Sequence, residues 1–242
     1  VFFSESENRD ILDQINRLER EEGFIPRSTT LDALKRALSA DNTFEQAIRR
    51  SGHVVLPYVF LFGRDEARFQ SKRDAERALA NIQNTAFSVI RATGDGRTDF
   101  PMVETSGLVT NLPALAAAAQ AGGHINSIPD GDGSVRWAPL VIRHQGLFFP
   151  SADLQAARLH LDQPLALRVS DYGIKGVELG TRLIPTDEYG RALIRYHGPV
   201  GTIPTFSMKD ILAGRLPPDA LRGRIVLIGA TAQGLGDIRV TP

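Results

Sequence analysis

The first quarter of the chain places apolar residues at helical intervals. Isoleucines and leucines three or four positions apart predict three amphipathic helices, over residues 11–23, 28–39 and 41–52. We expect Asn42 to cap the third helix and Gly52 to end it. The run that follows, residues 53–62, is almost wholly apolar and predicts a buried strand.

The middle of the chain is more polar. Residues 64–91 carry many charges at helical spacing, which predicts an exposed helix in an insertion. Residues 92–107 are rich in turn-forming residues and predict a loop or hinge. A helix of small residues is predicted over 112–123, with Asn111 as its N-cap.

The second half has the rhythm of short strands. Residues 135–150 predict a hairpin that turns at Gln145–Gly146, and Ser151 is expected to start the next helix. Further elements follow: strands at 165–170, 174–180, 192–198 and 224–229, and a helix at 206–214. Helices alternating with apolar strands predict an α/β layered sandwich with a central mixed β-sheet. We expect one domain over residues 1–242, with 64–111 as an insertion or subdomain.

Composition limits the classes of function. The chain has 42% hydrophobic and 23% charged residues, the values of an ordinary globular protein. Lys plus Arg and Asp plus Glu both number 28, so no net field favours nucleic acid as a partner. There is no cysteine, which excludes a thiol nucleophile, a thiolate metal site and a disulfide. No apolar stretch has the length of a membrane span, and Pro113 interrupts the longest candidate.

A glycine-rich loop follows the last predicted strand. Gly229 and Gly234 have the glycine spacing of a phosphate-binding P-loop, but Leu235 stands at the lysine position and Gly236 at the hydroxyl position. No helix is predicted after the loop to bind an anion at its N-terminus. We therefore expect the glycines to turn the backbone, and we predict no cofactor.

Two carboxylates alternate with glycines in a short turn. Asp130 and Asp132 have the spacing that calcium loops use, so they are a weak metal candidate. The stretch lacks a later bidentate Glu, and Arg136 adds a positive charge, so a β-turn with Asx hydrogen bonds explains it better. The five histidines show no zinc-binding spacing, and no G-x-S-x-G motif is present.

Residues 183–199 form a more distinctive stretch. Asp187 and Gly190 predict a turn between two strands, after which Arg191 and Arg195 share one face of a strand and Tyr196 the other. Two guanidiniums on one face are able to grip an anionic ligand. They are equally able to form structural ion pairs with Asp130, Asp187 or Asp237, and the sequence leaves both interpretations open.

Several segments of the second half, taken in order, resemble the type-two CHASE family of extracytoplasmic sensor domains. The segments are "GHINSIPDGDGSVRWAPLVI", "GLFFPSADLQAARL", "LIPTDEYGRALIRYHGP", "DILAGRLPPDALRGRIVLIGATAQGLGD" and "TP". "VFFSE" and "GHVVLP" agree more loosely, and residues 64–111 offer no match on which the resemblance rests. The family's usual opening strand and helix are also missing from the start of the sequence.

The resemblance implies an extracytoplasmic, periplasmic domain of a bacterial inner-membrane or plasma-membrane receptor, with transmembrane helices on either side. Its output would be a cytoplasmic adenylate or guanylate cyclase, a histidine kinase or a Ser/Thr kinase, so the chain itself is not an enzyme. The implied partners are an unknown small molecule or periplasmic ligand and a second copy in a homodimer. Residues at motif positions are the ligand-binding candidates: Asn126, Asp130, Asp132, Arg136, Asp187, Arg191, Tyr196, Thr231 and Asp237.

Two other functions are compatible with the residues. A soluble hydrolase or transferase would bring Asp130, Asp187, Asp237 and the nearby arginines together around the glycine loop, with strongly perturbed pKa values. A structural or dimerisation module would show an exposed apolar patch without a pocket. Convergence of the acidic residues in one place separates the first from the sensor hypothesis.

Overall fold

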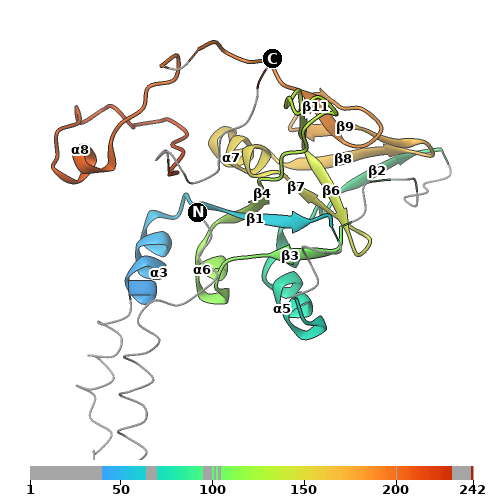
Figure 1. Cartoon of the computed structure of the whole chain (residues 1–242), viewed down its shortest axis with the longest axis horizontal. Coiled ribbons are helices and arrows are strands. Elements are labelled where there is room, and N and C mark those ends of the chain that lie inside the picture. Colours follow the sequence, from blue (N-terminus) through green and yellow to red (C-terminus); the bar gives the residue numbers. More distant parts are fainter. Residues whose placement is uncertain are drawn as a thin grey trace, which may run out of the picture. The chain divides into compact units, whose positions relative to one another are not determined.

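The computed structural model describes residues 40–63, 70–94, 100, 102, 105–199, 201–230 and 241 (Figure 1). The helices predicted over 11–23 and 28–39 lie outside these residues. The α/β class is confirmed, because helices and strands alternate along the described chain. Its strands are divided among a three-stranded sheet, a four-stranded sheet and two pairs of strands.

The chain forms two compact units, each built from three stretches. Unit 1 comprises Val1–Ser88, Met102–Asn126 and Ile142–Gln155, and unit 2 comprises Val89–Pro101, Ser127–Val141 and Ala156–Pro242. The chain therefore passes between the units several times. Residues 64–111, predicted as an insertion, supply strands to both: β3 (Gly107–Val109) belongs to unit 1 and β2 (Ile90–Thr93) to unit 2.

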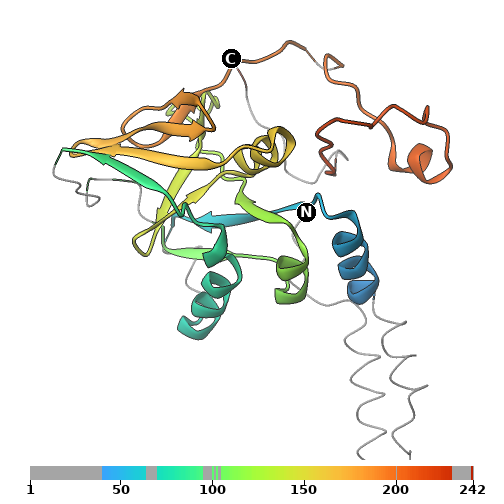
Figure 2. The same ribbon diagram turned by 180° about the vertical axis from the view of Figure 1, so that it is seen from behind.

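Unit 1 is centred on β1 (Val55–Leu61), the strand predicted over 53–62. β1 lies between β3, which is antiparallel to it, and β4 (Ala121–His124), which is parallel. The helices of the unit are α3 (Ala40–Ser51), α5 (Lys72–Ile82) and α6 (Pro113–Ala118), with a 3-10 turn at Gln83–Thr85. α3 and α6 lie side by side in both ribbon views (Figure 2).

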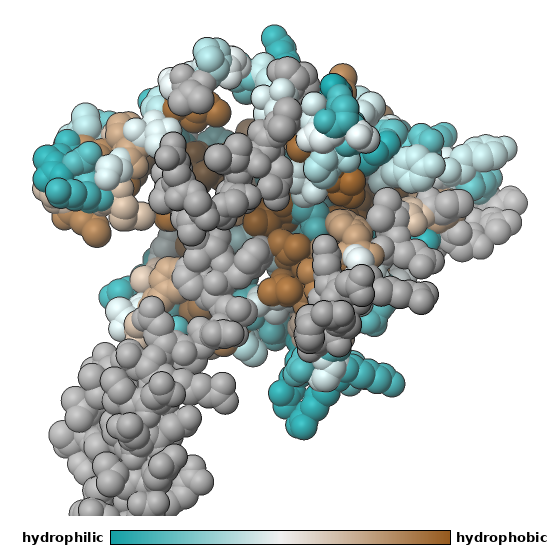
Figure 3. Space-filling view, in the orientation of Figure 1, coloured by the Kyte–Doolittle hydropathy of each residue, from teal (hydrophilic) through white to brown (hydrophobic). Residues whose placement is uncertain are grey.

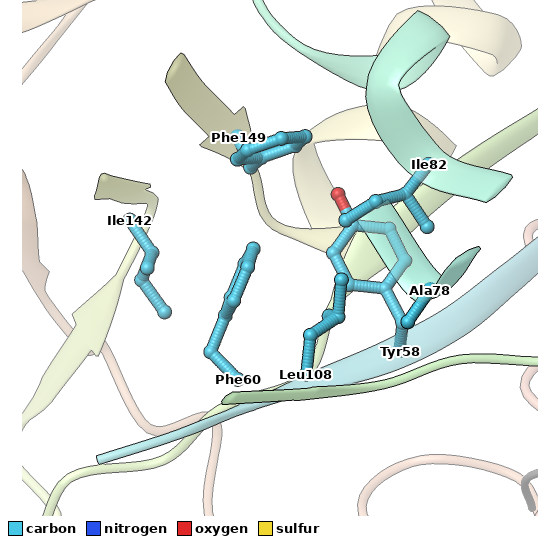
Figure 4. Packing of buried hydrophobic residues seen from close by; sticks show 7 residues of the cluster. All are labelled: Tyr58, Phe60, Ala78, Ile82, Leu108, Ile142 and Phe149. Carbon is cyan, nitrogen blue, oxygen red and sulfur yellow. The ribbon is translucent and has the colours of Figure 1, made fainter. Parts of the chain in front are cut away.

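The main core of unit 1 joins the sheet to a hairpin. β6 (Val141–His144) and β7 (Leu147–Pro150) turn at Gln145–Gly146 as predicted, with both turn residues at positive φ. Phe60 points from β1 toward the side chains of Phe149 and Ile142, with Tyr58 and Leu108 beside it (Figure 4). Since these apolar side chains are almost fully buried, their removal from water is the main stabilising contribution to the unit.

Unit 2 contains the four-stranded sheet, in the order β10-β9-β8-β2. β8 (Leu165–Ser170) and β9 (Gly173–Leu179), both predicted as strands, form an antiparallel pair with a register shift between Arg168 and Val169. β10 (Arg182–Pro185) pairs with β9, and β2 runs parallel to β8. A separate pair is formed by β5 (Trp137–Pro139) and β11 (Arg191–Leu193). The helices are α7 (Ala152–Leu161), which starts in unit 1, and α8 (Met208–Leu212).

Four predicted elements differ from the structure. The helix expected over 64–91 is shorter, because the chain becomes β2 at Ile90 and pairs with β8. The helix expected over 112–123 ends at Ala118, and residues 121–124 form β4 instead. The strand expected over 192–198 ends at Leu193. Residues 224–229 form no strand, and their apolar side chains are exposed, up to 90% for Leu227.

The predicted helix caps are also corrected. Asn42 lies inside α3, which begins at Ala40, while Gly52 ends that helix at positive φ as predicted. Asn111 does not cap α6, because its side-chain amide donates to the Pro57 carbonyl of β1 at 2.7 Å. Ser151 stands directly before α7, as predicted, and its buried hydroxyl has no hydrogen-bond partner among the described residues. For Asn111, a tertiary contact with β1 therefore decides the partner of a side chain that its sequence position assigned to a helix cap.

Candidate functional site

The distinctive stretch after β10 folds into a turn organised by Asp187. One carboxylate oxygen of Asp187 accepts hydrogen bonds from the backbone N–H groups of Tyr189 (3.1 Å) and Arg191 (2.8 Å). The other accepts from the Arg191 side chain, Nε to Oδ2, at 2.7 Å. This turn delivers Arg191 into β11, where it lies opposite Pro139 of β5.

Gly190 is required at the centre of this turn. It has φ +79°, and a Cβ at this position would lie 2.8 Å from the Ile174 side chain and 3.1 Å from that of Val141. Its carbonyl also accepts a hydrogen bond from the Leu140 N–H at 2.9 Å. A side chain here would therefore be strained in two ways, by backbone conformation and by crowding.

The Arg191 guanidinium is held between aromatic rings. Its central carbon lies 5.5 Å from the Trp137 ring centroid and 5.4 Å from the Tyr189 ring centroid. Cation–π contacts of this kind, together with the bond to Asp187, fix the orientation of the side chain. Arg191 remains about one-third exposed, so part of the oriented guanidinium is accessible to solvent.

A second turn holds Arg136 between two carboxylates. Arg136 donates to Asp130 at 2.9 Å and to both carboxylate oxygens of Asp132, at 3.0 and 2.8 Å. Hydrogen bonds from Arg136, with one from the Ser134 N–H, hold the pKa of Asp132 well below its usual range. Asp132 raises the pKa of Arg136 in return. Together with the bond from the Gly133 N–H to the Asp130 carbonyl, these are the contacts of an Asx-stabilised β-turn.

The two turns meet at the paired strands β5 and β11. The Tyr196 hydroxyl donates to the Val135 carbonyl at 2.5 Å, and the Ile194 N–H donates to the Arg136 carbonyl at 2.8 Å. The structure thus brings together six candidates in unit 2, which we call the β5–β11 site: Asp130, Asp132, Arg136, Asp187, Arg191 and Tyr196. Arg195, predicted to share a face with Arg191, comes after the end of β11 and is exposed.

Asn126 belongs to unit 1 and is not part of this site. Its side-chain amide accepts from the Phe60 N–H at 3.0 Å and donates to the Phe60 carbonyl at 2.7 Å. Asn126 therefore extends the pairing of β1 beyond the end of β4, which is a structural role. Thr231 and Asp237 lie outside the described residues, so the structure does not place them.

Two groups of interacting residues were missed from the sequence. Trp137 and Tyr189 were not singled out, because the contact of Trp137 with Arg191 depends on the pairing of β5 with β11, and that of Tyr189 depends on the fold of the turn around Asp187. In the four-stranded sheet, Glu178 bridges Arg168 and Arg91, with the Arg91 bond at 3.0 Å. The hydrogen bond from Arg168 is the main cause that lowers the pKa of Glu178. Cross-strand partners of this kind carry no signal in sequence spacing.

The charged side chains of the β5–β11 site determine what chemistry it is able to perform. In the described turns, each arginine of the β5–β11 site binds an aspartate, so the site presents oriented and largely neutralised groups. Among the residues that the structure places, no three His, Cys, Asp or Glu side chains are grouped to hold a metal ion. No helix of the described chain is long and apolar enough to cross a membrane. The arrangement is suited to recognition by hydrogen bonds and aromatic contacts.

Comparison with known proteins gives one family. The family model for the CHASE2 domain matches residues 1–242, the whole chain. Neither the curated proteins nor the solved structures contain a match.

Proposed function

Because the chain belongs to the CHASE2 domain family, a family of extracytoplasmic sensor domains, we propose that it is the input domain of a bacterial membrane receptor. Its cytoplasmic output is an adenylate or guanylate cyclase or a protein kinase. The observation that carries the proposal is the extent of the family match, which includes every residue from 1 to 242. The ordered agreement of the second-half segments with the type-two CHASE pattern supports the same role.

The β5–β11 site is the proposed place of ligand recognition. Arg191 is held by Asp187 and by two aromatic rings, so little conformational entropy is lost when a ligand contacts it. Tyr189 and Tyr196 are 39% and 42% exposed, which leaves aromatic surface next to the charged groups. A small polar ligand, or a peptide that carries a carboxylate, fits this combination. Binding would alter output only as far as the ligand distinguishes two states of the receptor.

Cysteine labelling of the full-length receptor in intact cells tests the extracytoplasmic placement. The chain has no cysteine of its own, so a Tyr172→Cys variant, at a position 88% exposed, introduces one accessible thiol. We expect a membrane-impermeant maleimide to label it without permeabilising the inner membrane. Leu167→Cys, at a fully buried position, is the matched control and should react only after denaturation. Labelling of Tyr172→Cys only after the inner membrane is opened would refute the proposal.

A thermal-shift screen tests recognition at the β5–β11 site. The 242-residue chain is screened against small anions, nucleotides, peptides and divalent metals, because a ligand that binds the native state raises the unfolding temperature. For a ligand that binds this site, the rise in unfolding temperature should be mostly lost in the Arg191→Gln variant. It should be kept in Arg182→Gln, which replaces an exposed arginine on β10. The same hit should change cyclic-nucleotide production or phosphorylation by the full-length receptor. A shift that is unaffected by Arg191→Gln places recognition elsewhere.

A further inference from the structure

His144 is a titratable side chain inside the core of unit 1. It ends β6 and is 6% exposed. Its Nδ1 lies 2.7 Å from the Thr105 hydroxyl, which also contacts the Arg143 carbonyl at 3.4 Å. Its Nε2 is buried and has no hydrogen-bond partner among the described residues. In either neutral tautomer the ring satisfies one nitrogen only, so the ring has no second partner for an additional proton.

On the described strands around His144, no acidic side chain offers a counter-ion for a charged ring. The ring packs against Phe60 of β1, with ring centroids 5.3 Å apart, and Phe60 also contacts Phe149 of β7. The titratable or charged side chains on the surrounding strands are Tyr58 of β1, His124 of β4 and Arg143 of β6. Neither these strands nor β3 and β7 carry an Asp or Glu. From α5, the side chains that reach this core are Ala78, Leu79 and Ile82.

We propose that His144 makes the packing of the β6–β7 hairpin on β1 sensitive to the pH outside the cytoplasm, so that acid loosens this part of unit 1. A protonated ring would place a positive charge, and an N–H that has no partner among the described residues, in a buried position against the Phe60 ring. Opening the hairpin lets water solvate the charged ring instead. This inference goes beyond the proposed receptor role, since it requires neither a ligand nor an output domain.

The direction of the effect follows from linkage. Burial lowers the pKa of His144 from the ordinary value of 6.5. Above pH 6.5 the ring is neutral in both the folded and the opened state, so the pH has no influence through this group. Below pH 6.5 the opened state binds a proton that the folded state rejects, and stability falls until the folded pKa is reached. In that window the opening equilibrium should rise by up to about tenfold per pH unit.

Hydrogen exchange resolved to peptides tests the proposal on the 242-residue chain. Exchange of the β6–β7 amides is compared between pH 7.5 and 5.5 after correction for intrinsic rates. We expect protection of β6–β7 to fall severalfold in this range, while β8 and β9 in unit 2 lose much less. His144→Gln keeps a polar partner for Thr105 without titrating, and its β6–β7 protection should be nearly independent of pH. His160→Gln, at an exposed position on α7, should behave like the wild type.

Two results would overturn the proposal. One is an equal loss of β6–β7 protection in acid for the wild type and His144→Gln. The other comes from NMR titration of the histidine ring carbons in the wild type, which remains informative if His144→Gln fails to fold. A His144 ring that becomes protonated near pH 6.5 while the β6–β7 amides stay protected would show that the core tolerates the charge.

Discussion

Side-chain amides take the place of a neighbouring strand on the two outer sides of the β1–β3 pair, at Phe60 and at Leu108. Phe60 and Leu108 face each other across the two strands. The amide of Asn126 binds the backbone N–H and carbonyl of Phe60, and the amide of Gln70 binds those of Leu108, at 3.1 and 2.6 Å. Each amide carries both a donor and an acceptor group, and here uses one of each, so it matches a backbone edge as another strand would. The outward-facing backbone groups of Phe60 and Leu108 therefore have hydrogen-bond partners although no strand lies beside them.

Replacing Asn126 with alanine should destabilise unit 1. The substitution leaves the N–H and carbonyl of Phe60 without their partners, and an unsatisfied buried polar group costs about 1–3 kcal/mol. We expect the free energy of unfolding, measured by urea titration with far-UV circular dichroism, to fall by roughly 2 kcal/mol. Asn84→Ala, at an exposed position, should stay within about 0.5 kcal/mol of the wild type. A similar small effect for both variants would argue against the structural role of Asn126.

Asn126 also shows why residue roles were hard to predict from the sequence. Its place in a motif made it a ligand-binding candidate, and nothing in the local sequence indicates that its amide reaches a strand 66 positions earlier. Asp187 was easier, because both its turn and its ion pair with Arg191 lie within four residues. Local hydrogen bonding leaves a pattern in the sequence, whereas pairing between distant strands does not.

Elements were predicted best where a periodic pattern ended in a residue with a strong backbone preference. The hairpin at Gln145–Gly146, α7, β8 and β9 all meet this condition. β4 does not: its sequence, AGGH, continues a run of small residues that is compatible with a helix. It becomes a strand because Ala121 to His124 pair with β1 and because Gly123 allows the start of α7 to approach closely.

This close approach makes Gly123 intolerant of a side chain. A Cβ at Gly123 would lie 2.5 Å from the backbone N and Cα of Ala152, which are not able to move without displacing α7. We expect Gly123→Ala to lower the free energy of unfolding by about 1–3 kcal/mol or more, as overpacking does. Gly131→Ala is the matched control, since nothing lies within 4 Å of its Cβ position. Equal unfolding midpoints in urea for the two variants would contradict the packing of β4 against α7.

At the scale of the whole molecule, several arginines of the described chain form ion pairs with acidic residues close to them in sequence. Arg136, Arg191 and Arg215 each bind an aspartate no more than six residues away. The balance of 28 acidic and 28 basic residues therefore includes many short-range ion pairs, and an arginine within a motif is no evidence of a ligand by itself. For the same reason, the proposal that the β5–β11 site recognises a ligand is based on the aromatic rings around Arg191 as well as on the charge of Arg191.

The most exposed apolar surface lies near the end of the described chain. Met208 and Leu212 of α8 are 49% and 81% exposed, and this helix shows hydrophobic surface beside hydrophilic surface at the left of Figure 3. Ile225, Val226, Leu227 and Ile228 are all at least 45% exposed, although they were predicted to form a strand. An apolar run of this composition, unpaired and in water, favours association with other chains.

Replacing part of this run should reduce self-association without unfolding the protein. In the double variant Leu227→Lys/Ile228→Lys, two side chains that are 90% and 74% exposed become charged, so no core packing is lost. We expect light scattering to show less concentration-dependent association than in the wild type, with an unchanged urea midpoint. Tyr172→Lys, which changes an isolated side chain with 88% exposure, should leave association as it is. A lower urea midpoint for the double variant would mean instead that residues 225–228 are packed, because a charge harms stability only where it replaces a buried contact.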